Sequence, residues 1–65
     1  MKVNELLSKA TLFGDTKAKL ASALGISTTA LANKLRGDSE FKASEIKTIS
    51  DMYNLTDDEV RSIFF

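Results

Sequence analysis

This sequence contains no cysteine, no histidine and no proline. Without cysteine the fold has no disulfides, and without cysteine or histidine it has no ligand cluster for a structural metal ion. General acid or base catalysis would then depend on carboxylates and lysines, and the acidic residues do not gather with partners of that kind. The three glycines belong to no phosphate-binding motif. We therefore expect no enzyme, no metal site and no cofactor.

Long apolar runs are also absent, since no stretch approaches the roughly 20 residues that a helix needs to cross a bilayer. The first residues lack the apolar core of a signal peptide. These absences predict a cytoplasmic protein. No repeat, low-complexity tract or proline-containing linker divides the chain, so we expect a single domain over residues 1–65. A chain of this size buries only roughly 60% of its unfolded surface, so its stability should be modest.

The charges balance over the whole sequence, with nine basic and nine acidic residues, but they do not balance along it. Residues 16–36 carry four basic and no acidic residues, a net charge of +4. Residues 37–65 carry three basic and seven acidic residues, a net charge of −4. A folded protein with this distribution should have a basic face and an acidic face. Such polarity favours an oriented approach to nucleic acid without the indiscriminate binding of a strongly basic protein.

Apolar residues recur at helical spacing in five segments, and no segment alternates in the manner of a strand. The fifth segment has the clearest start, because Thr56 and Glu59 form a capping box. The fourth starts less clearly, since Lys42 stands where a threonine would complete a box with Glu45. The sequence therefore predicts an all-α fold of five helices, at about residues 2–13, 17–24, 27–36 and 43–53 and from residue 56 onward.

The functional prediction depends on residues 16–37, which form two short helices joined by a glycine turn. Thr16 caps the first helix, and Gly25 ends it at the position where a left-handed conformation is easiest without a Cβ. Ser27 caps the second helix, and Gly37 ends it. This pattern predicts a sharp turn between two packed helices.

The second of these helices has one apolar face, centred on Leu31 and Leu35. Small hydroxyl and amide groups on the outer side of a short helix suit the major groove of DNA, where an acid would be repelled by phosphate. At 100° per residue, the opposite side and the exposed first turn carry such groups and one cation: Thr28, Thr29, Asn33 and Arg36.

This segment resembles the helix-turn-helix of the phage Cro and CI repressor family, the lambda-repressor-like (XRE) family. The resemblance is carried by small and apolar residues at the family's positions: Leu20, Ala21, Leu24, Gly25, Ile26 and Leu31. The stretches GDTKAKLASALGIS and EFKASEIKTISDMYNLTDDEV and the final IFF look like small prophage-encoded regulators of that superfamily. The resemblance implies a five-helix lambda-repressor-like DNA-binding domain with the helix-turn-helix at its second and third helices.

The resemblance also implies roles for individual side chains. Thr28, Thr29 and Asn33 would face base edges, where an asparagine amide can pair with adenine. Thr16, Lys17 and Arg36 would lie near phosphates. The four basic residues of the segment also suit a phosphate clamp: Lys17, Lys19, Lys34 and Arg36. Two positions depart from the family pattern, because Lys17 stands where many members have glutamine and Lys34 where an apolar residue is usual. The full set of predicted DNA-binding residues is Thr16, Lys17, Ser27, Thr28, Thr29, Asn33, Lys34 and Arg36.

Concentrated apolar surface occurs at Ile63, Phe64 and Phe65. We expect Ile63 in the core. Phe64 and Phe65 either join the same core or form a two-fold dimer contact, and the sequence leaves both alternatives open. Since family members commonly bind as dimers, the resemblance implies a homodimer on a double-stranded DNA operator.

Together these features predict a sequence-specific double-stranded DNA-binding transcriptional regulator, a prophage Cro-like repressor that occupies its operator through the major groove. No small-molecule effector is expected, because a single small domain leaves no second domain to hold one. The alternative is a protein-interaction module that binds a repressor or a polymerase subunit through the acidic face between Asp38 and Glu59. Salt dependence and charge reversal on each face distinguish the two functions.

Overall fold

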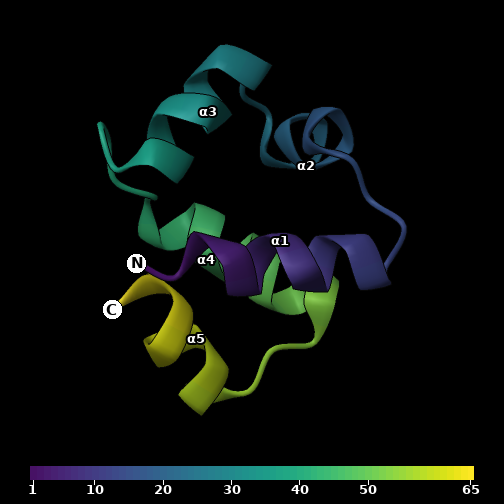
Figure 1. Cartoon of the computed structure of the whole chain (residues 1–65), viewed down its shortest axis with the longest axis vertical. Helices are drawn as coiled ribbons and strands as arrows, with labels where there is room; N and C mark the ends of the chain where they lie inside the picture. The colour runs from purple at the N-terminus through teal and green to yellow at the C-terminus, as the bar shows by residue number, and fades with distance from the viewer.

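Five helices form the protein, and no residue is in a strand (Figure 1). The computed structural model describes residues 1–65. None of the helices combines the length and the apolar character that crossing a bilayer requires. The predicted all-α fold of five helices is confirmed. The helices are α1 (Val3–Leu12), α2 (Lys17–Leu24), α3 (Thr28–Arg36), α4 (Ala43–Tyr53) and α5 (Asp57–Phe64).

Short signals at the helix ends account for these boundaries. At the end of α2, Gly25 adopts a left-handed conformation with φ of +71°, which a residue with a Cβ would enter only with strain. The Gly25 amide donates to the Ser22 carbonyl at 3.1 Å, and the Ile26 amide donates to the Ala21 carbonyl at 3.0 Å. These two bonds satisfy carbonyl groups that the helix end leaves unpaired. The chain therefore leaves α2 abruptly and enters α3 through the turn Gly25–Ser27.

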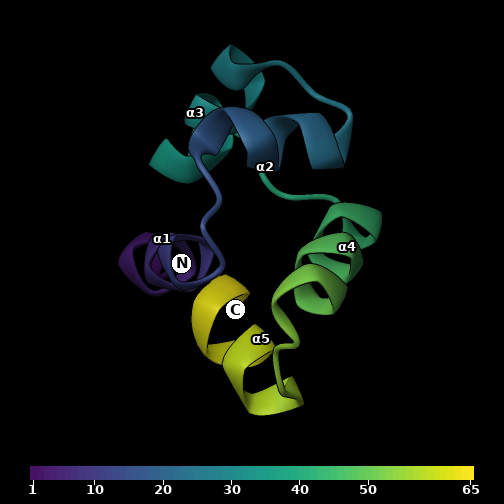
Figure 2. The ribbon, with the colours of Figure 1, turned by 90° about the vertical axis from the view of Figure 1, so that its right-hand side faces the viewer.

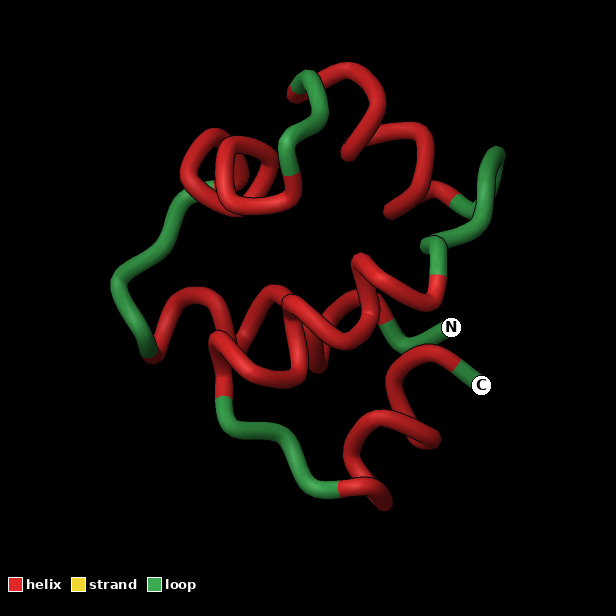
Figure 3. Tube along the Cα trace, turned by 180° about the vertical axis from the view of Figure 1, so that it is seen from behind, coloured by secondary structure: helices red, strands yellow, loops and turns green.

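The helices divide the molecule into two ends along its longest dimension of 28 Å. At one end α2 and α3 pack against each other, and α5 lies at the opposite end (Figure 1, Figure 2). Between them, α4 contacts both α2 and α5, and α1 contacts α5. Short loops join all five helices, as the view from behind shows (Figure 3). The α2–α3 pair is thus separated from the acidic first turn of α5.

Every helix contributes to a single apolar core. Seven further apolar side chains, Phe41 and Phe64 among them, pack partly buried against it. The predicted burial of Leu31 and Ile63 is confirmed, since each is 1% exposed. Because α2, α3 and α4 share this core, the orientation of α3 depends on contacts throughout the molecule. The buried apolar residues are Leu6, Ala10, Leu20, Ala21, Leu31, Ile49, Tyr53 and Ile63.

Phe13 departs from the sequence prediction, which places it inside the first helix. The helix ends at Leu12, and Phe13 is 53% exposed. Its ring centroid lies 5.2 Å from that of Tyr53, and the Tyr53 hydroxyl donates to Asp15 Oδ2 at 3.0 Å. The α1–α2 loop is therefore attached to α4 by one aromatic contact and one hydrogen bond.

The first and last helices are joined side by side, and the two ends of the chain lie close together (Figure 1). The Lys2 amide donates to the Ile63 carbonyl at 2.8 Å. Further along, the Lys9 ammonium lies 2.6 Å from Glu59 Oε2. These contacts fix α1 to α5 at the end of the molecule opposite α3.

Candidate nucleic-acid interface

Two capped helix starts define the α2–α3 unit. The Thr16 hydroxyl oxygen accepts from the Lys19 amide at 3.2 Å, and the Ser27 hydroxyl oxygen accepts from the Ala30 amide at 3.0 Å. Each oxygen pairs one amide that the first turn of a helix leaves free. Thr16 and Ser27 are both exposed, so their hydroxyl hydrogens can still donate to an acceptor outside the protein.

The outer side of α3 carries the residues predicted to face bases. Thr28 and Thr29 are exposed in the first turn, and Asn33 is half-buried in the middle of the helix. Arg36 is exposed at the end of the helix. No acidic residue occurs in α2 or α3. The outer side of α3 therefore presents hydroxyl, amide and guanidinium groups without a carboxylate from either helix.

Arg36 is held on this surface by two neighbours. Its Nε donates to Asp38 Oδ2 at 3.2 Å, and its Nη2 donates to Asn33 Oδ1. Both side chains of the ion pair are more than half exposed, so it is an accessible surface contact. The guanidinium thus connects the end of α3 with the Asn33 amide in the middle of the helix.

Lys34 does not lie on this surface: its side chain is buried, so the structure does not present it to phosphate as the sequence prediction requires. It is 9% exposed, and its ammonium lies 3.0 Å from Glu45 Oε1 and donates to the Glu40 carbonyl at 3.0 Å. The Phe41 ring centroid is 5.8 Å from the same nitrogen. Lys34 fills the core position where the family pattern has an apolar residue, and a buried lysine requires such a partner.

Glu45 is the acid that makes this burial possible. Its Oε1 also accepts from the Lys42 amide at 2.8 Å, so the capping interaction at the start of α4 is present without a hydroxyl from Lys42. Burial by itself raises the pKa of the Glu45 carboxyl, but hydrogen bonds from the Lys42 amide and the Lys34 ammonium outweigh it. The pKa of Glu45 is therefore lower than its ordinary value. The charged carboxylate joins α3 to the start of α4.

Only part of the positive charge of residues 16–36 is consequently available at the surface. Lys34 is paired inside the protein, and Arg36 is paired with Asp38. Lys17 and Lys19 are exposed on α2, and neither forms an ion pair within the chain. Within residues 16–36, the exposed cations without an ion pair are therefore Lys17 and Lys19 on α2, which packs against α3.

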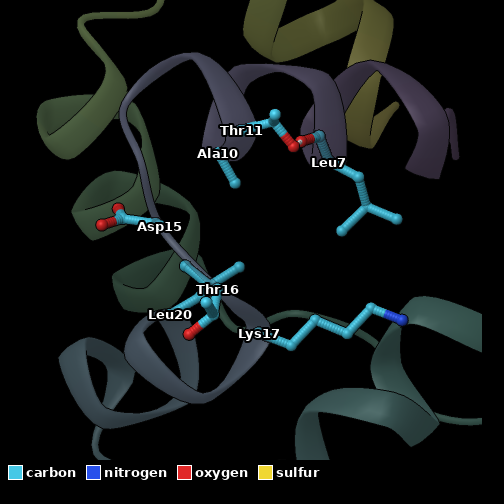
Figure 4. Close-up of a pocket in the computed structure, with 7 residues that line it drawn as sticks. All are labelled: Leu7, Ala10, Thr11, Asp15, Thr16, Lys17 and Leu20. Atoms are coloured by element: carbon cyan, nitrogen blue, oxygen red, sulfur yellow. Dashed lines mark hydrogen bonds between the residues drawn. The ribbon is translucent and has the colours of Figure 1, made fainter.

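A pocket of about 280 Å³ separates α1 from the start of α2 (Figure 4). The Thr11 hydroxyl in its wall donates to the Leu7 carbonyl at 2.9 Å, and Asp15 accepts from a tyrosine. Lys17 extends along the opening, and its ammonium lies away from Asp15 (Figure 4). No buried side-chain polar atom in the protein lacks a hydrogen-bond partner. The residues that line the pocket are Leu7, Ala10, Thr11, Asp15, Thr16, Lys17 and Leu20.

Comparison of the chain with models of known protein families gave a match. The family model of the BetR domain matches residues 1–61. The chain belongs to the BetR domain family. The match includes all of α1 to α4 and the first part of α5. Comparisons with curated proteins and with solved structures gave no match. The finer resemblance to Cro and CI repressors stays a prediction.

The acidic part of the BetR domain includes the first turn of α5. The predicted capping box is present there, since the Glu59 amide donates to the Thr56 hydroxyl at 3.1 Å and the Thr56 amide donates to Glu59 Oε1 at 3.0 Å. Hydrogen bonds from Lys9 first, and then from the Thr56 amide, hold the pKa of the Glu59 carboxyl below its ordinary value. No three acidic side chains converge where they could hold a metal ion. The capping box and the ion pair with Lys9 of α1 thus account for Glu59.

Phe64 and Phe65, which follow the matched residues 1–61, have different surroundings. Phe64 is partly buried, and its ring meets the Phe41 ring edge-on with the centroids 5.5 Å apart. Phe65 is 85% exposed. Of the two alternatives that the sequence leaves open, Phe64 therefore follows the first and packs on its own core. The Phe65 ring is available for contact with another molecule.

The predicted set of DNA-binding residues omits two residues that organise this region, Asp38 and Glu45. A lysine at an apolar position signals that an acid must lie nearby, but the sequence does not say which acid. The signal for Asp38 is local, because it follows the helix-ending Gly37 and stands two residues after Arg36. Both acids act by holding a cation that the sequence prediction assigns to DNA.

Proposed function

We propose that this BetR domain is a sequence-specific double-stranded DNA-binding protein, a prophage Cro-like transcriptional repressor that acts by occupying its operator. The observation that carries the proposal is the outer side of α3, where Thr28, Thr29 and Asn33 stand on an acid-free helix next to the unpaired Lys17. In this proposal α2 and α3 form a helix-turn-helix, and α3 enters the major groove.

The chemistry of the face fits base-edge recognition. A threonine can donate to or accept from several bases and can place its methyl group against that of thymine, so it does not specify one base. An asparagine amide can pair with adenine N6 and N7, which is worth roughly 1–3 kcal/mol of discrimination. Thr16 and Lys17, at the start of α2, would contact phosphates and set the register of the protein on the duplex. Repression then follows from occupancy, without catalysis, a cofactor or an effector.

The proposed binding unit is a homodimer on DNA. Helix-turn-helix dimers place their reading helices in successive major grooves, about 34 Å apart. The exposed ring of Phe65 offers apolar area for such a contact, whereas Phe64 is already packed within its own chain. The proposal therefore assigns the dimer contact to Phe65 and not to Phe64.

Selection of bound duplexes from a random pool at near-physiological salt tests the function. An enriched inverted repeat with half-sites about one helical turn apart supports the dimeric repressor. A single enriched half-site supports DNA binding and removes the dimer. Weak, salt-sensitive retention without enrichment contradicts the proposal. The protein-interaction module, which would bind a repressor or a polymerase subunit through the acidic side, would then be the better explanation.

A further inference from the structure

We infer that Arg36 is a positioning residue for Asn33, and that Asp38, Arg36 and Asn33 form a relay that sets base preference. The inference rests on the proposed DNA-binding function and deepens it. In the sequence prediction Arg36 only contacts phosphate, which would affect all DNA sequences alike. The relay makes Arg36 and Asp38 determinants of specificity at the base pair that Asn33 reads.

The relay starts from a rigid part of the backbone. Gly37 ends α3 in a left-handed conformation with φ of +86°, and its amide donates to the Lys34 carbonyl at 3.1 Å. The next amide, that of Asp38, donates to the Asn33 carbonyl at 2.9 Å. This pair of bonds is a defined helix end that fixes where the chain leaves α3. The backbone of Asp38 is thereby held next to the last turn of the helix.

From Asp38, two hydrogen bonds lead back along α3, first to Arg36 and then to Asn33. Asp38 Oδ2 accepts from Arg36 Nε at 3.2 Å, which turns the guanidinium back along α3. Arg36 Nη2 then donates to Asn33 Oδ1, one turn earlier on the same helix. Asn33 is half-buried, so its amide has less freedom than one on an open surface. Asp38 thus orients Arg36, and Arg36 orients Asn33.

The chemistry of the groups fixes which way the Asn33 amide faces. A guanidinium has donors and no acceptor, so only the oxygen of an amide can face it. Asn33 Oδ1 therefore points toward Arg36, and its NH2 group is on the other side. A bidentate contact with a base needs the oxygen and the nitrogen of the amide in a defined order. An amide free to turn over would lose this advantage, and Arg36 prevents that turn.

The relay and a simple phosphate contact predict different effects of the same substitution. The base pair read by Asn33 is first identified as the position where Asn33→Ala lowers discrimination, by between about 5-fold and about 150-fold. Arg36→Lys keeps the positive charge but not the planar fork that holds two acceptors at once. The relay predicts that Arg36→Lys lowers discrimination at that same base pair. It also predicts that the double variant Asn33→Ala with Arg36→Lys discriminates there almost as well as Asn33→Ala alone.

Asp38→Asn should change overall affinity and base discrimination in opposite directions. It removes an acidic group beside the DNA surface, so binding to all duplexes should strengthen. It also weakens the hold on Arg36, so discrimination at the Asn33 base pair should fall. The matched control is Asp58→Asn, because Asp58 and Arg61 form a similar exposed pair on α5, with oxygen and nitrogen 3.6 Å apart. The control changes net charge equally and should leave the base preference unchanged.

A measurement without DNA separates the relay from the proposed function. The chain has three asparagines, no glutamine and two arginines, so side-chain NMR signals of Asn33 and Arg36 can be assigned individually. Arg36→Lys and Asp38→Asn should each shift the Asn33 side-chain NH2 signals, and Arg61→Lys should not.

Two results would overturn the inference alone. One is that Arg36→Lys and Asp38→Asn keep the wild-type base preference while overall affinity changes uniformly. The other is that Asn33 NH2 signals do not respond to either variant. The absence of any preferred duplex for the wild-type protein would overturn the proposed function and the inference together. A result on the wild-type protein therefore contradicts the proposed function, whereas results on the variants contradict the relay alone.

Discussion

The ammonium group of Lys34 lies 3.0 Å from Glu45 Oε1, and only 10% and 9% of the two side chains are exposed. The pair joins α3 to the start of α4. The same ammonium donates to the Glu40 carbonyl, and the same carboxylate oxygen accepts from the Lys42 amide. Removing two charges from water is costly, so such a pair stabilises the fold only while both charges and their hydrogen bonds are present.

Glu45→Gln should lower the free energy of unfolding by about 3 kcal/mol, because the charge of Lys34 then stays buried without its partner. The glutamine can still accept from the Lys42 amide, so the loss reports the ion pair. The double variant Lys34→Met with Glu45→Gln removes both charges and should regain most of the stability. Urea unfolding of the two single variants and the double variant measures the coupling. A double variant no more stable than Glu45→Gln would contradict this account.

The stability should also fall in acid, partly through Glu45. The pKa of its carboxyl is lower in the folded protein than the value of about 4.5 for an unfolded chain. The unfolded state therefore takes up protons first, and the contribution is complete above about pH 4.5 and is lost as the pH falls through the folded pKa. The lowered pKa of Glu59 acts in the same window, so the loss is shared.

Thermal unfolding between pH 7 and pH 3 tests this prediction. Glu45→Gln should flatten the acid dependence relative to the wild-type protein. Asp51→Asn is the matched control, because Asp51 is an exposed acid on the same helix, 3.6 Å from Lys47. An equal flattening by Asp51→Asn would show that net charge, and not the buried pair, causes the acid sensitivity.

The hydrogen bond between Tyr53 and Asp15 should be visible at high pH. Burial first, and then the interaction with Asp15, raises the pKa of Tyr53 to about 12. The stability that comes from the neutral phenol is complete below about pH 10, the unfolded value, and is lost as the pH rises through 12. The chain has one tyrosine, so tyrosinate absorbance reports this group alone. Asp15→Asn should lower the Tyr53 pKa, and an unchanged titration would contradict the contact.

Salt dependence should separate the two lysines that the sequence places in one basic cluster. Lys17→Ala should weaken binding to all duplexes and reduce the salt slope by about 0.9, as the loss of one phosphate contact requires. The Lys34→Met and Glu45→Gln double variant should keep the wild-type slope, since Lys34 is buried and paired. Binding titrations of the three proteins from low to physiological salt measure both values. A reduced slope in the double variant alone would reverse this assignment.

Most of the fold could be predicted because its signals are local. The residues at the turn, Gly25 and Ser27, and the box of Thr56 and Glu59 act within one helical turn, so the sequence alone reveals them. The bounds of α2 and α4 agree with the prediction for the same reason. Phe13 was harder to predict, because a ring at a helix end can continue the apolar stripe or pack against a distant residue such as Tyr53.

The pairing of charges could not be predicted, because it depends on which segments meet in space. Lys34 and Arg36 are close in sequence and equal in charge, yet one is buried against Glu45 and the other is exposed beside Asp38. Their position around the helix decides this difference, together with the way in which α4 approaches α3. The count of positive charges therefore overstated the number of cations that α2 and α3 expose.

The hydrogen bond from the Lys2 amide to the Ile63 carbonyl has a consequence for the order in which the protein opens. It closes nearly the whole chain into one loop, and the entropy cost of closing a loop rises with its length. The packing of α2 on α3 closes only the turn Gly25–Ser27. In hydrogen exchange, the α1–α5 contact should therefore open at a lower free energy than the α2–α3 contact. The α2–α3 pair, which is the proposed helix-turn-helix, would therefore stay folded while the two ends of the chain separate.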